Sequence, residues 1–417
     1  EIKELALKIR DVVGYTGKIV HDTNKPDGTM KKLMDVSFAN SLGLKTNISL
    51  NEGLKKTYSW FLRNMEMETV IVTGGLGYIG SHTVVELLNA NYDVVVIDNF
   101  SNSSEKVIDR IHAITKKKFD FIEADLRNYT RIESAIGFYQ QSTVGVIHFA
   151  ACKSVGESMK NPSKYYDNNV TGTNNLLMAM KRYKADNLVF SSSCTVYGQA
   201  DDLPVTEKTP QKPAESVYGR TKQINEQMIK DFHNEYKFNS ILLRYFNPIG
   251  AHKTSLIGEL PNGTPDNLLP YVAQTAAGER DLLTVYGDDY NTKDGTCIRD
   301  YIHVVDLAKA HVTAMKTSVE KNLKAEPVNL GTGKGYSVKE VLEAFETENN
   351  IKVNTHYGNR RKGDVEAIYA DPSYAYELLN WKAELGLKEM VKSVWNWQKT
   401  LTKKSCGSGC KCSCKSK

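Results

Sequence analysis

The chain has 417 residues, of which 41% are hydrophobic and 25% charged, a composition typical of a globular protein with two or three cores. No run approaches the ~18 apolar residues of a membrane span, and no charged-then-apolar secretory signal opens the chain. The formal net charge is +5, but residues 403–417 hold five lysines and no acid, so the rest of the chain is neutral overall. This balance argues against nucleic acid or a membrane as a partner.

Residues 1–64 share a pattern with a later segment of the chain. Residues 50–60 parallel residues 387–397, with Leu, Glu, an aliphatic residue, Lys, an aromatic residue and Trp at matching offsets. Upstream, residues 35–37 parallel residues 371–373, one residue out of register. A match that extends past one helix makes chance similarity between amphipathic helices the weaker explanation.

A nucleotide-binding pattern begins with a β-type run at residues 69–72. The turn that follows carries glycines spaced three residues apart, Gly74, Gly77 and Gly80. They let the backbone turn tightly, approach a diphosphate and pack a helix closely on a strand. A helical pattern, residues 81–88, begins directly afterwards, and its unpaired N–H groups would hold the diphosphate.

A second apolar strand, residues 93–97, ends in an acidic residue, Asp98. We expect this carboxylate to bind the adenosine ribose hydroxyls and to repel a 2′-phosphate, which favours NAD over NADP. Three glycines alone are weak evidence. Strand, glycines, helix, strand and acid in this order predict a dinucleotide site.

Strands and helices alternate from residue 69 onward. Further strand-like runs lie at residues 144–149, 187–191 and 240–244, and helical stretches at 171–182 and 218–234. This alternation predicts an α/β fold with a Rossmann-like doubly wound parallel sheet. From residue 247 to about 294 the sequence becomes rich in Gly, Pro, Asn and Asp, which is typical of ligand-binding loops and a smaller domain.

The cysteines fall into two groups. Three of the seven, Cys152, Cys194 and Cys297, are scattered through the body, which favours a reducing cytoplasm over a disulfide framework. The other four crowd the tail: Cys406, Cys410, Cys412 and Cys414. These tail cysteines could bind a soft metal or accept a lipid, or they could belong to a disordered Lys/Cys-rich extension. We expect the extension, and no metal site, because no His or second cysteine cluster completes a familiar metal site.

Tyr218 and Lys222 stand four residues apart in a predicted helix and therefore share a face. An ammonium about 4–5 Å from the phenol would lower the pKa of Tyr218 toward neutrality and make it a general base. A Ser-rich strand end, residues 191–193, offers a hydroxyl that can share a proton with a substrate oxygen. Tyr-x-x-x-Lys alone is common on surface helices. After a dinucleotide site and a Ser-rich strand end it predicts a catalytic pair.

With these motifs in place, residues 67 to about 401 resemble the UDP-glucose 4-epimerases, a family of the extended short-chain dehydrogenase/reductases. The resemblance covers the whole segment and rests on specific motifs. These are Gly-Tyr-Ile-Gly-Ser-His at 77–82, Val-Gly-Glu-Ser at 155–158, Tyr-Tyr-Asp-Asn-Asn-Val at 165–170, Ser-Ser-Ser-x-Thr-Val-Tyr-Gly at 191–198, Leu-Arg-Tyr-Phe-Asn-Pro at 243–248, Asp-Gly-Thr-x-x-Arg-Asp-Tyr-Ile-His-Val at 294–304 and Arg-Arg-x-Gly-Asp at 360–364.

The resemblance implies roles for individual residues. Tyr218 would be the base, Lys222 its electrostatic partner and a ligand of the nicotinamide ribose, and Ser193 a hydroxyl relay. NAD would be contacted by Gly74, Gly77, Tyr78, Ile79, Gly80, Asp98, Asn99, Asp125, Leu126, Phe149, Ala150, Lys153, Asn168, Tyr218, Lys222 and Phe246. The UDP-sugar would be contacted by Ser193, Tyr218, Asn247, Asn267, Leu268, Arg299, Tyr301, Arg361, Asp364 and Ile368.

The resemblance also implies the reaction and the domain plan. UDP-galactose and UDP-glucose would interconvert through a 4-keto intermediate with tightly bound NAD, in a cytoplasmic homodimer of galactose metabolism. Residues 67–245 would form the NAD-binding domain, to which some later segments return, and residues 246–402 mainly the UDP-sugar-binding domain. Residues 1–64 would be a fused fragment and residues 403–417 a disordered tail.

One position departs from the pattern of some family members. Where they carry a tyrosine that limits the size of the sugar 2-substituent, this chain has the smaller Ile368. N-acetylated UDP-hexosamines would then fit as well. A packing residue without selectivity explains the position equally well, and both explanations stay open.

Residues 1–64 resemble a different protein, the C-terminal end of GDP-L-fucose synthase. The similarity runs from Lys25-Pro26-Asp27-Gly28-Thr29 through Leu50 to Trp60-Phe61-Leu62. No glycine fingerprint and no Tyr-x-x-x-Lys precede this piece, so it cannot catalyse alone. It is a remnant of a larger fusion, a docking appendage, or an artefact of how the ends of the chain are defined.

Three alternatives compete with UDP-glucose 4-epimerase activity. Nucleotide-sugar 4,6-dehydratases carry an Asp-Glu pair after the Ser-rich strand, where this chain has Cys194 and Thr195. UDP-glucuronate 4-epimerases fit the loop at residues 262–271 less well. A non-catalytic scaffold or regulator that holds NAD and a UDP-sugar is disfavoured because Ser193, Tyr218 and Lys222 are all present.

Overall fold

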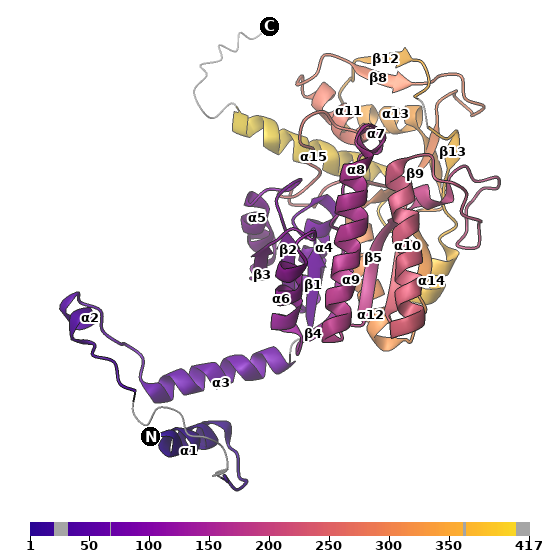
Figure 1. The fold of residues 1–417 in the computed structure, drawn as a ribbon. Helices are drawn as coiled ribbons and strands as arrows, with labels where there is room; N and C mark the ends of the chain where they lie inside the picture. The colour runs from indigo at the N-terminus through magenta and orange to yellow at the C-terminus, as the bar shows by residue number, and fades with distance from the viewer. Residues whose placement is uncertain (21–31, 67, 362–363, 406–417) are drawn as a thin grey trace, which may run out of the picture. The chain divides into compact units, whose positions relative to one another are not determined.

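The computed structural model describes residues 1–20, 32–66, 68–361 and 364–405 (Figure 1). The chain divides into two compact units, Glu1–Met67 and Glu68–Lys417. The tail cysteines, the Lys25–Thr29 part of the N-terminal resemblance, and Lys362 and Gly363 lie outside the described residues.

A seven-stranded parallel sheet runs through the larger unit, with strand order β10-β6-β5-β4-β1-β2-β3. This sheet confirms the predicted Rossmann-like fold class. Near-continuous apolar runs such as Val70–Val72 are buried on both sides, as parallel strands between two helix layers require. The strands are β1 (Thr69–Thr73), β2 (Asp93–Asp98), β3 (Asp120–Glu123), β4 (Thr143–His148), β5 (Asn187–Ser193), β6 (Asn239–Tyr245) and β10 (Glu326–Leu330).

Helices cover both faces of this sheet. Because side chains alternate along a strand, Val70 and Val72 pack in one core and Ile71 in the other. The first face is covered by α4 (Tyr78–Asn89), α5 (Lys106–Thr115), α12 (Val304–Glu320) and α14 (Ser373–Leu379). The second is covered by α6 (Tyr129–Tyr139), α9 (Gly172–Tyr183) and α10 (Val217–Tyr236), which lie in front of the sheet in Figure 1.

Smaller elements gather beyond one end of the sheet (Figure 1). One small sheet holds β7 (Asn247–Ile249), β9 (Ile298–His303), β11 (Gly335–Ser337) and β13 (Ala367–Ile368), and another holds β8 (Leu283–Tyr286) and β12 (Thr355–Gly358). Three helices pack with them around a third core: α11 (Leu268–Ala276), α13 (Val338–Asn349) and α15 (Leu387–Ser405).

The expectation of loops from residue 247 to about 294 is wrong in part. The segment contains α11 and β8. Leu269, Val272 and Ala273 lie at helical spacing and are buried in the third core, so tertiary packing forms a helix within a Gly/Pro/Asn-rich stretch.

The main sheet is completed late in the chain. β10 pairs with β6 in parallel, from Glu326 opposite Ile241 to Leu330 opposite Tyr245, after the chain has formed β7, β8 and β9. Residues 68–417 form one compact unit, so the domain boundaries at residues 245 and 402 remain predictions.

The smaller unit contains α1 (Ile2–Val13), α2 (Ser37–Ser41) and α3 (Leu50–Glu66). Its first helix begins in the same way as α13 of the larger unit. A capping box joins Glu1 and Glu4 at the start of α1, and another joins Ser337 and Glu340 at the start of α13. In both, the third helical residue is a glutamate that reaches back to the cap.

A second local structure recurs at the same sequence spacing. Asp35 Oδ1 accepts hydrogen bonds from the backbone N and the Oγ of Ser37, at 2.9 and 2.5 Å. Asp371 Oδ1 accepts the corresponding bonds from Ser373, also at 2.9 and 2.5 Å. The short helices α2 and α14 start at these turns. The parallel seen in the sequence between residues 35–37 and 371–373 therefore extends to local structure at the starts of α2 and α14.

Candidate active site

The turn between β1 and α4 is built so that only glycine fits. At Gly74, where φ is +70°, a Cβ would lie 2.7 Å from the backbone N of Ala150, and at Gly80 it would lie 2.2 Å from the carbonyl oxygen of Gly74. Gly77 is the N-cap of α4. The turn thus forms a backbone cradle at a helix N-terminus, which fits a dinucleotide diphosphate.

Tyr78 and Ile79 open α4, and Phe149 lies across from them at the end of β4. The Tyr78 hydroxyl donates to the Gly250 carbonyl at 2.7 Å, and Ile79 packs against the first core. The backbone N of Phe149 donates to the Thr73 carbonyl at 2.9 Å. Phe149 and the cradle are therefore fixed to each other.

Asp98 ends β2, and its carboxylate is tied to the glycine turn. Oδ2 accepts from the backbone N of Leu76 at 3.1 Å. Oδ1 accepts from the backbone N of Phe100 at 3.0 Å and from Ser103 Oγ at 2.8 Å. The side chain is 8% exposed, at the carboxyl ends of the strands where doubly wound sheets bind ligands.

Asn99 and Asp125 form a polar cluster beside this edge. Asn99 Nδ2 donates to Asp125 Oδ2 at 2.9 Å. Arg127 donates to both carboxylate oxygens, from Nε at 2.9 Å and from Nη2 at 2.8 Å, and these bonds hold the pKa of Asp125 well below its usual range. Arg127 was not predicted, and Leu126 between them is buried in the second core.

Residues of the Tyr-Tyr-Asp-Asn-Asn-Val motif form a π-helix, η1 (Tyr166–Thr171). Its Asn169 holds the loop after β4, because Oδ1 accepts from the backbone N of Cys152 at 2.8 Å and Nδ2 donates to the carbonyl of Cys152 at 3.0 Å. Asn168 Nδ2 donates to Asn169 Oδ1 at 3.1 Å. Short π-helical turns are frequent at functional sites, and this one fixes the residue next to Lys153.

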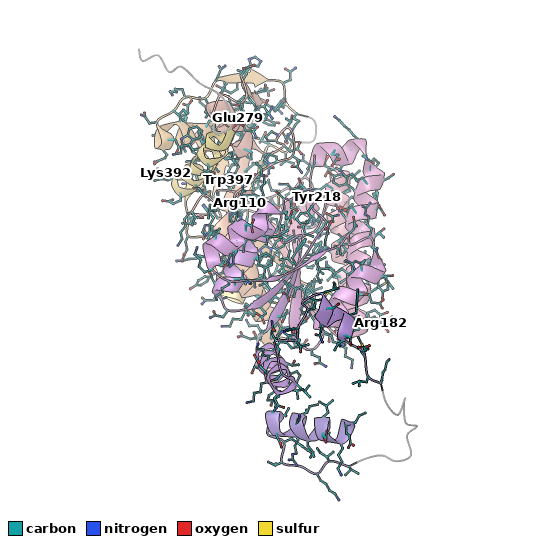
Figure 2. The ribbon with its side chains drawn as sticks, turned by 90° about the vertical axis from the view of Figure 1, so that its left-hand side faces the viewer. Arg110, Arg182, Tyr218, Glu279, Lys392 and Trp397 are labelled. Carbon is teal, nitrogen blue, oxygen red and sulfur yellow. The ribbon has the colours of Figure 1, made fainter. Side chains whose placement is uncertain are left out.

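The structure brings Ser193, Tyr218 and Lys222 together. Ser193 ends β5, Tyr218 lies in the first turn of α10, and the Ser193 side chain is near enough to the phenol to lower its pKa. Lys222 Nζ lies 5.8 Å from the centroid of the Tyr218 ring and donates to the carbonyl of Ser191 at 2.6 Å. Figure 2 labels Tyr218 near the junction of the sheet with the smaller elements.

The expected lowering of the Tyr218 pKa is wrong for the protein alone. Burial raises the pKa of Tyr218 to about 12, and the Ser193 side chain offsets only part of this effect. Burial also lowers the pKa of Lys222 to about 7, so its positive charge is only partly present at neutral pH. Tyr218 therefore keeps its proton at neutral pH in the protein alone.

A buried ion pair lies below the three residues. Arg244 Nη2 and Glu226 Oε2 are 2.6 Å apart, with side chains 3% and 1% exposed. Glu226 accepts from Ser192 Oγ at 2.6 Å, and Arg244 Nη1 donates to the Tyr197 hydroxyl at 3.0 Å. This network ties α10 to β5 and β6 and so fixes Tyr218 relative to the strand ends.

On the side of the smaller elements, two arginines share one carboxylate. Arg361 donates to Asp364 from Nε at 3.2 Å and from Nη2 at 3.1 Å. Arg299 Nη2 lies 3.9 Å from Asp364 Oδ1. The group keeps a net positive charge, which suits recognition of a diphosphate.

The remaining residues expected at the sugar nucleotide occupy the same region. Asn247 begins β7 opposite Tyr301 of β9, and Tyr301 is 3% exposed in the third core. Asn267 is the N-cap of α11, and Leu268 is its half-buried first residue.

Ile368 is 6% exposed and belongs to a fourth core together with Cys194 and Phe246. It therefore has a packing role, and a role in sugar selectivity stays a prediction.

Three further properties concern the described residues. Cys152, Cys194 and Cys297 are free thiols. Nowhere among residues 1–20, 32–66, 68–361 and 364–405 do three or more His, Cys, Asp or Glu side chains gather in a way that could hold a metal ion. In the same part of the chain, no helix combines the length and the apolarity that crossing a membrane requires.

Sequence reasoning missed Arg127, Asn169 and Glu259. Glu259 lies in the loop before α11 and accepts hydrogen bonds from Lys153 and Asn267. The Asn-Asn pair of the 165–170 motif pointed to Asn169. No spacing or composition in the sequence singled out Glu259.

Comparison with known proteins gives a consistent result. A family model described as GDP-mannose 4,6 dehydratase matches residues 71–394. The UDP-glucose 4-epimerase of Bacillus subtilis is 50% identical over 330 residues, which is 79% of this chain and 96% of that protein.

Two solved structures are also similar. The UDP-glucose-4-epimerase of Stenotrophomonas maltophila, with bound NAD and formylated UDP-arabinopyranose, has a TM-score of 0.78 and 44% identity, covering 81% of this chain and 99% of that one. The UDP-glucose 4-epimerase of Bifidobacterium longum, in complex with NAD+ and UDP, has a TM-score of 0.76 and 46% identity, covering 80% and 98%.

Proposed function

The chain belongs to the UDP-glucose 4-epimerase family of the extended short-chain dehydrogenase/reductases, and from this we propose that Ser193, Tyr218 and Lys222 catalyse the interconversion of UDP-galactose and UDP-glucose. The observation that carries the proposal is 50% identity over 330 residues to an enzyme of that activity, combined with these three side chains lying together at one strand end.

NAD is the cofactor of this activity, and the residues of the chain fit it. A Cβ at Gly74 would clash with the backbone of Ala150, and a Cβ at Gly80 with the carbonyl oxygen of Gly74, so the tight turn that would carry the diphosphate depends on glycine at both positions. Asp98 would hold the adenosine ribose, with Asn99 and Asp125 beside it. When bound, NAD supplies a reversible hydride acceptor for carbon 4 of the sugar.

Tyr218 would take the proton of the sugar 4-hydroxyl and return it after the sugar has turned over. Ser193, which lies beside the phenol of Tyr218, would pass the proton between the phenol and the substrate oxygen. Tyr218 holds its proton in the protein alone, so the site with NAD and substrate bound must favour the phenolate of Tyr218. Protonated Lys222, near the phenol ring, is the group of this chain placed to do so.

The UDP moiety would be held by residues remote from the reacting carbon. Arg299 and Arg361 would bind the diphosphate, with Asn247 and Asn267 beside them. Binding energy at this distance would retain the 4-keto sugar while it turns to present its other face. Ile368 would leave room for an N-acetylated sugar, which extends the proposal to UDP-N-acetylhexosamines.

Dehydration of a nucleotide sugar is not proposed, although the matching family model carries that description. Cys194 and Thr195 follow Ser193, and burial raises the pKa of the Cys194 thiol to about 12. These residues do not offer an acid and a base for removing water.

The assembly and location are proposed from the same family resemblance. The chain would form a homodimer. A location in the cytoplasm would agree with three free cysteines in the body of the chain. Light scattering on the purified chain would test the dimer, and a monomeric mass would exclude it.

The decisive experiment incubates the purified chain with UDP-galactose and no added NAD, and measures the UDP-glucose formed. We expect conversion, which would also demonstrate retained cofactor. No conversion after NAD is added would overturn the proposal. UDP-N-acetylgalactosamine would be the next substrate, and a chain inactive on both would be a non-catalytic binding protein.

Tyr218→Phe tests the catalytic assignment. We expect the rate to fall by about 10²–10⁴-fold, because the phenol proton transfer is lost, while bound NAD stays at the level of the unchanged chain. Tyr236→Phe, at an exposed position of the same helix, is the matched control and should be fully active. A near-normal rate in Tyr218→Phe would contradict the assignment.

A further inference from the structure

One carboxylate joins the two halves of the site. Glu259 lies in the loop between β7 and α11, with its side chain 9% exposed. Its Oε1 accepts from Lys153 Nζ at 2.9 Å and from Asn267 Nδ2 at 2.6 Å. Lys153 comes from the loop after β4, on the proposed cofactor side, and Asn267 from the start of α11, on the proposed substrate side.

Glu259 is itself held from behind. Its carbonyl accepts from Trp397 Nε1 of α15 at 2.9 Å. Trp397 is 4% exposed, and the Arg110 guanidinium of α5 lies 5.3 Å from its ring centroid, so the two side chains lie together in Figure 2. The backbone at Glu259 is therefore fixed by packing, whichever group its side chain contacts.

Lys153 is held in a defined place by this pairing. Its Nζ lies 5.9 Å from the ring centroid of Tyr78, the first residue of α4, and its side chain is 49% exposed. An ammonium has three N–H donors and a carboxamide has two, so Lys153 and Asn267 each keep donors free while bonded to Glu259. Both can then bind an anionic ligand from the position that Glu259 gives them.

A carboxylate here has an electrostatic cost. The proposed site would receive the diphosphate of NAD and the diphosphate of the UDP-sugar, the second at Arg299 and Arg361. A carboxylate without a partner would repel both. Pairing with Lys153 neutralises Glu259. The electrostatic cost of the carboxylate is offset because it orders two side chains, Lys153 and Asn267, that would bind different ligands.

We propose that Glu259 is a positioning residue that couples occupancy of the cofactor site to occupancy of the substrate site. This inference rests on the proposed function. Half of the Lys153 side chain is exposed, so a ligand that covers it restricts Lys153 further and, through the shared oxygen of Glu259, restricts Asn267 as well. The second ligand then meets a more ordered donor. The coupling is reciprocal: UDP tightens NAD by the same factor by which NAD tightens UDP.

The test measures this factor in the full-length chain. After the NAD retained from purification has been removed, NAD affinity is determined with and without saturating UDP, and UDP affinity with and without NAD, by calorimetry on the unchanged protein and on variants. We expect a factor in the range of about 5–150 for the unchanged chain. Glu259→Ala should reduce the factor to about 1, because it removes the acceptor shared by Lys153 and Asn267.

Glu259→Gln separates positioning from folding. It retains an acceptor oxygen of similar shape, so it should restore part of the factor that Glu259→Ala loses. Glu279→Gln is the matched control, since Glu279 is an exposed carboxylate whose Oε1 accepts from Gln398 at 2.8 Å, away from Lys153 and Asn267. It should keep the full factor.

Two outcomes would overturn the proposal. One is a Glu259→Ala chain that keeps the full factor. This includes the case where the variant binds NAD or UDP more weakly, but by the same ratio with and without the other ligand. The other is an unchanged chain in which UDP and NAD bind independently. Absence of NAD binding or of epimerisation in the unchanged chain would instead contradict the proposed function.

Discussion

Four histidines of the larger unit are kept neutral by burial. Burial lowers the pKa of His82 and His148 to about 3 and that of His303 and His311 to about 4. In an unfolded chain each would titrate near 6.5. Between about pH 6.5 and 4 the unfolded state therefore binds more protons than the folded state, so stability is complete above this range and falls as the pH falls through it.

We accordingly expect the free energy of unfolding to drop steeply from pH 6.5 to 4, as measured by urea titration at several pH values. His311 packs against the rings of Phe149 and Tyr245, with ring centroids 4.6 and 5.8 Å away, and its Nε2 has no hydrogen-bond partner within the described part of the chain. His311→Phe keeps an aromatic ring there and should reduce the pH slope by about one proton.

His356 is exposed and provides the matched control. His356→Gln should leave the pH slope as it is. An unchanged slope in His311→Phe, or an equal change in His356→Gln, would show that buried histidines are not the origin of the acid sensitivity.

The sequence predicted which residues meet at the site better than it predicted their chemistry. Ser193, Tyr218 and Lys222 were expected together because one ends a strand and two share a helix face. The pKa of Tyr218 was not predictable, because a four-residue spacing says nothing about burial. Glu259 was missed because its partner Lys153 is 106 residues away in the chain.

At the scale of elements, the tight packing of the turn between β1 and α4 predicts that NAD binding depends on glycine at position 80. A Cβ at Gly80 would lie 2.2 Å from the Gly74 carbonyl oxygen, which is backbone and cannot move aside cheaply. Gly80→Ala should displace the turn, lose bound NAD and lose activity with it. NAD content of the purified variant is the measurement.

Gly156→Ala is the control for this turn, because a Cβ at Gly156 meets no atom within 4 Å. It should keep both cofactor and activity. Retention of NAD by Gly80→Ala would show that the cradle tolerates displacement and that its tightness is not required.

Element boundaries followed from the sequence for continuously buried apolar strands and for helices with one buried face. The strand expected at 187–191 is Asn187–Ser193, and the helix expected at 218–234 is Val217–Tyr236. The π-helix at Tyr166–Thr171 was not expected, because a π-turn has the composition of an ordinary helix start. The parallel between residues 35–37 and 371–373 was visible in the sequence, because Asp35 and Asp371 start the turns that lead into α2 and α14. The shared capping boxes of α1 and α13 were seen only in the structure.

At the scale of the whole molecule, the two units predict separable roles. Every residue proposed for the site lies in Glu68–Lys417, which has its own four cores. A chain that begins at Glu68 should remain folded and epimerise UDP-galactose with an unchanged kcat. Activity and thermal unfolding of this shortened chain against the full chain are the measurements. Insolubility or loss of activity would show that the N-terminal unit belongs to the functional fold.

The late position of β10 has a consequence for the newborn protein. β6 ends at Tyr245, but its outer neighbour β10 ends only at Leu330, so the edge of β6 that β10 covers in the finished sheet stays unpaired while the intervening residues are translated. At synthesis rates of about 5–20 residues per second, this lasts on the order of 10 s. An unpaired edge strand is a site of aggregation, so chaperone demand on the ribosome should be highest in this interval.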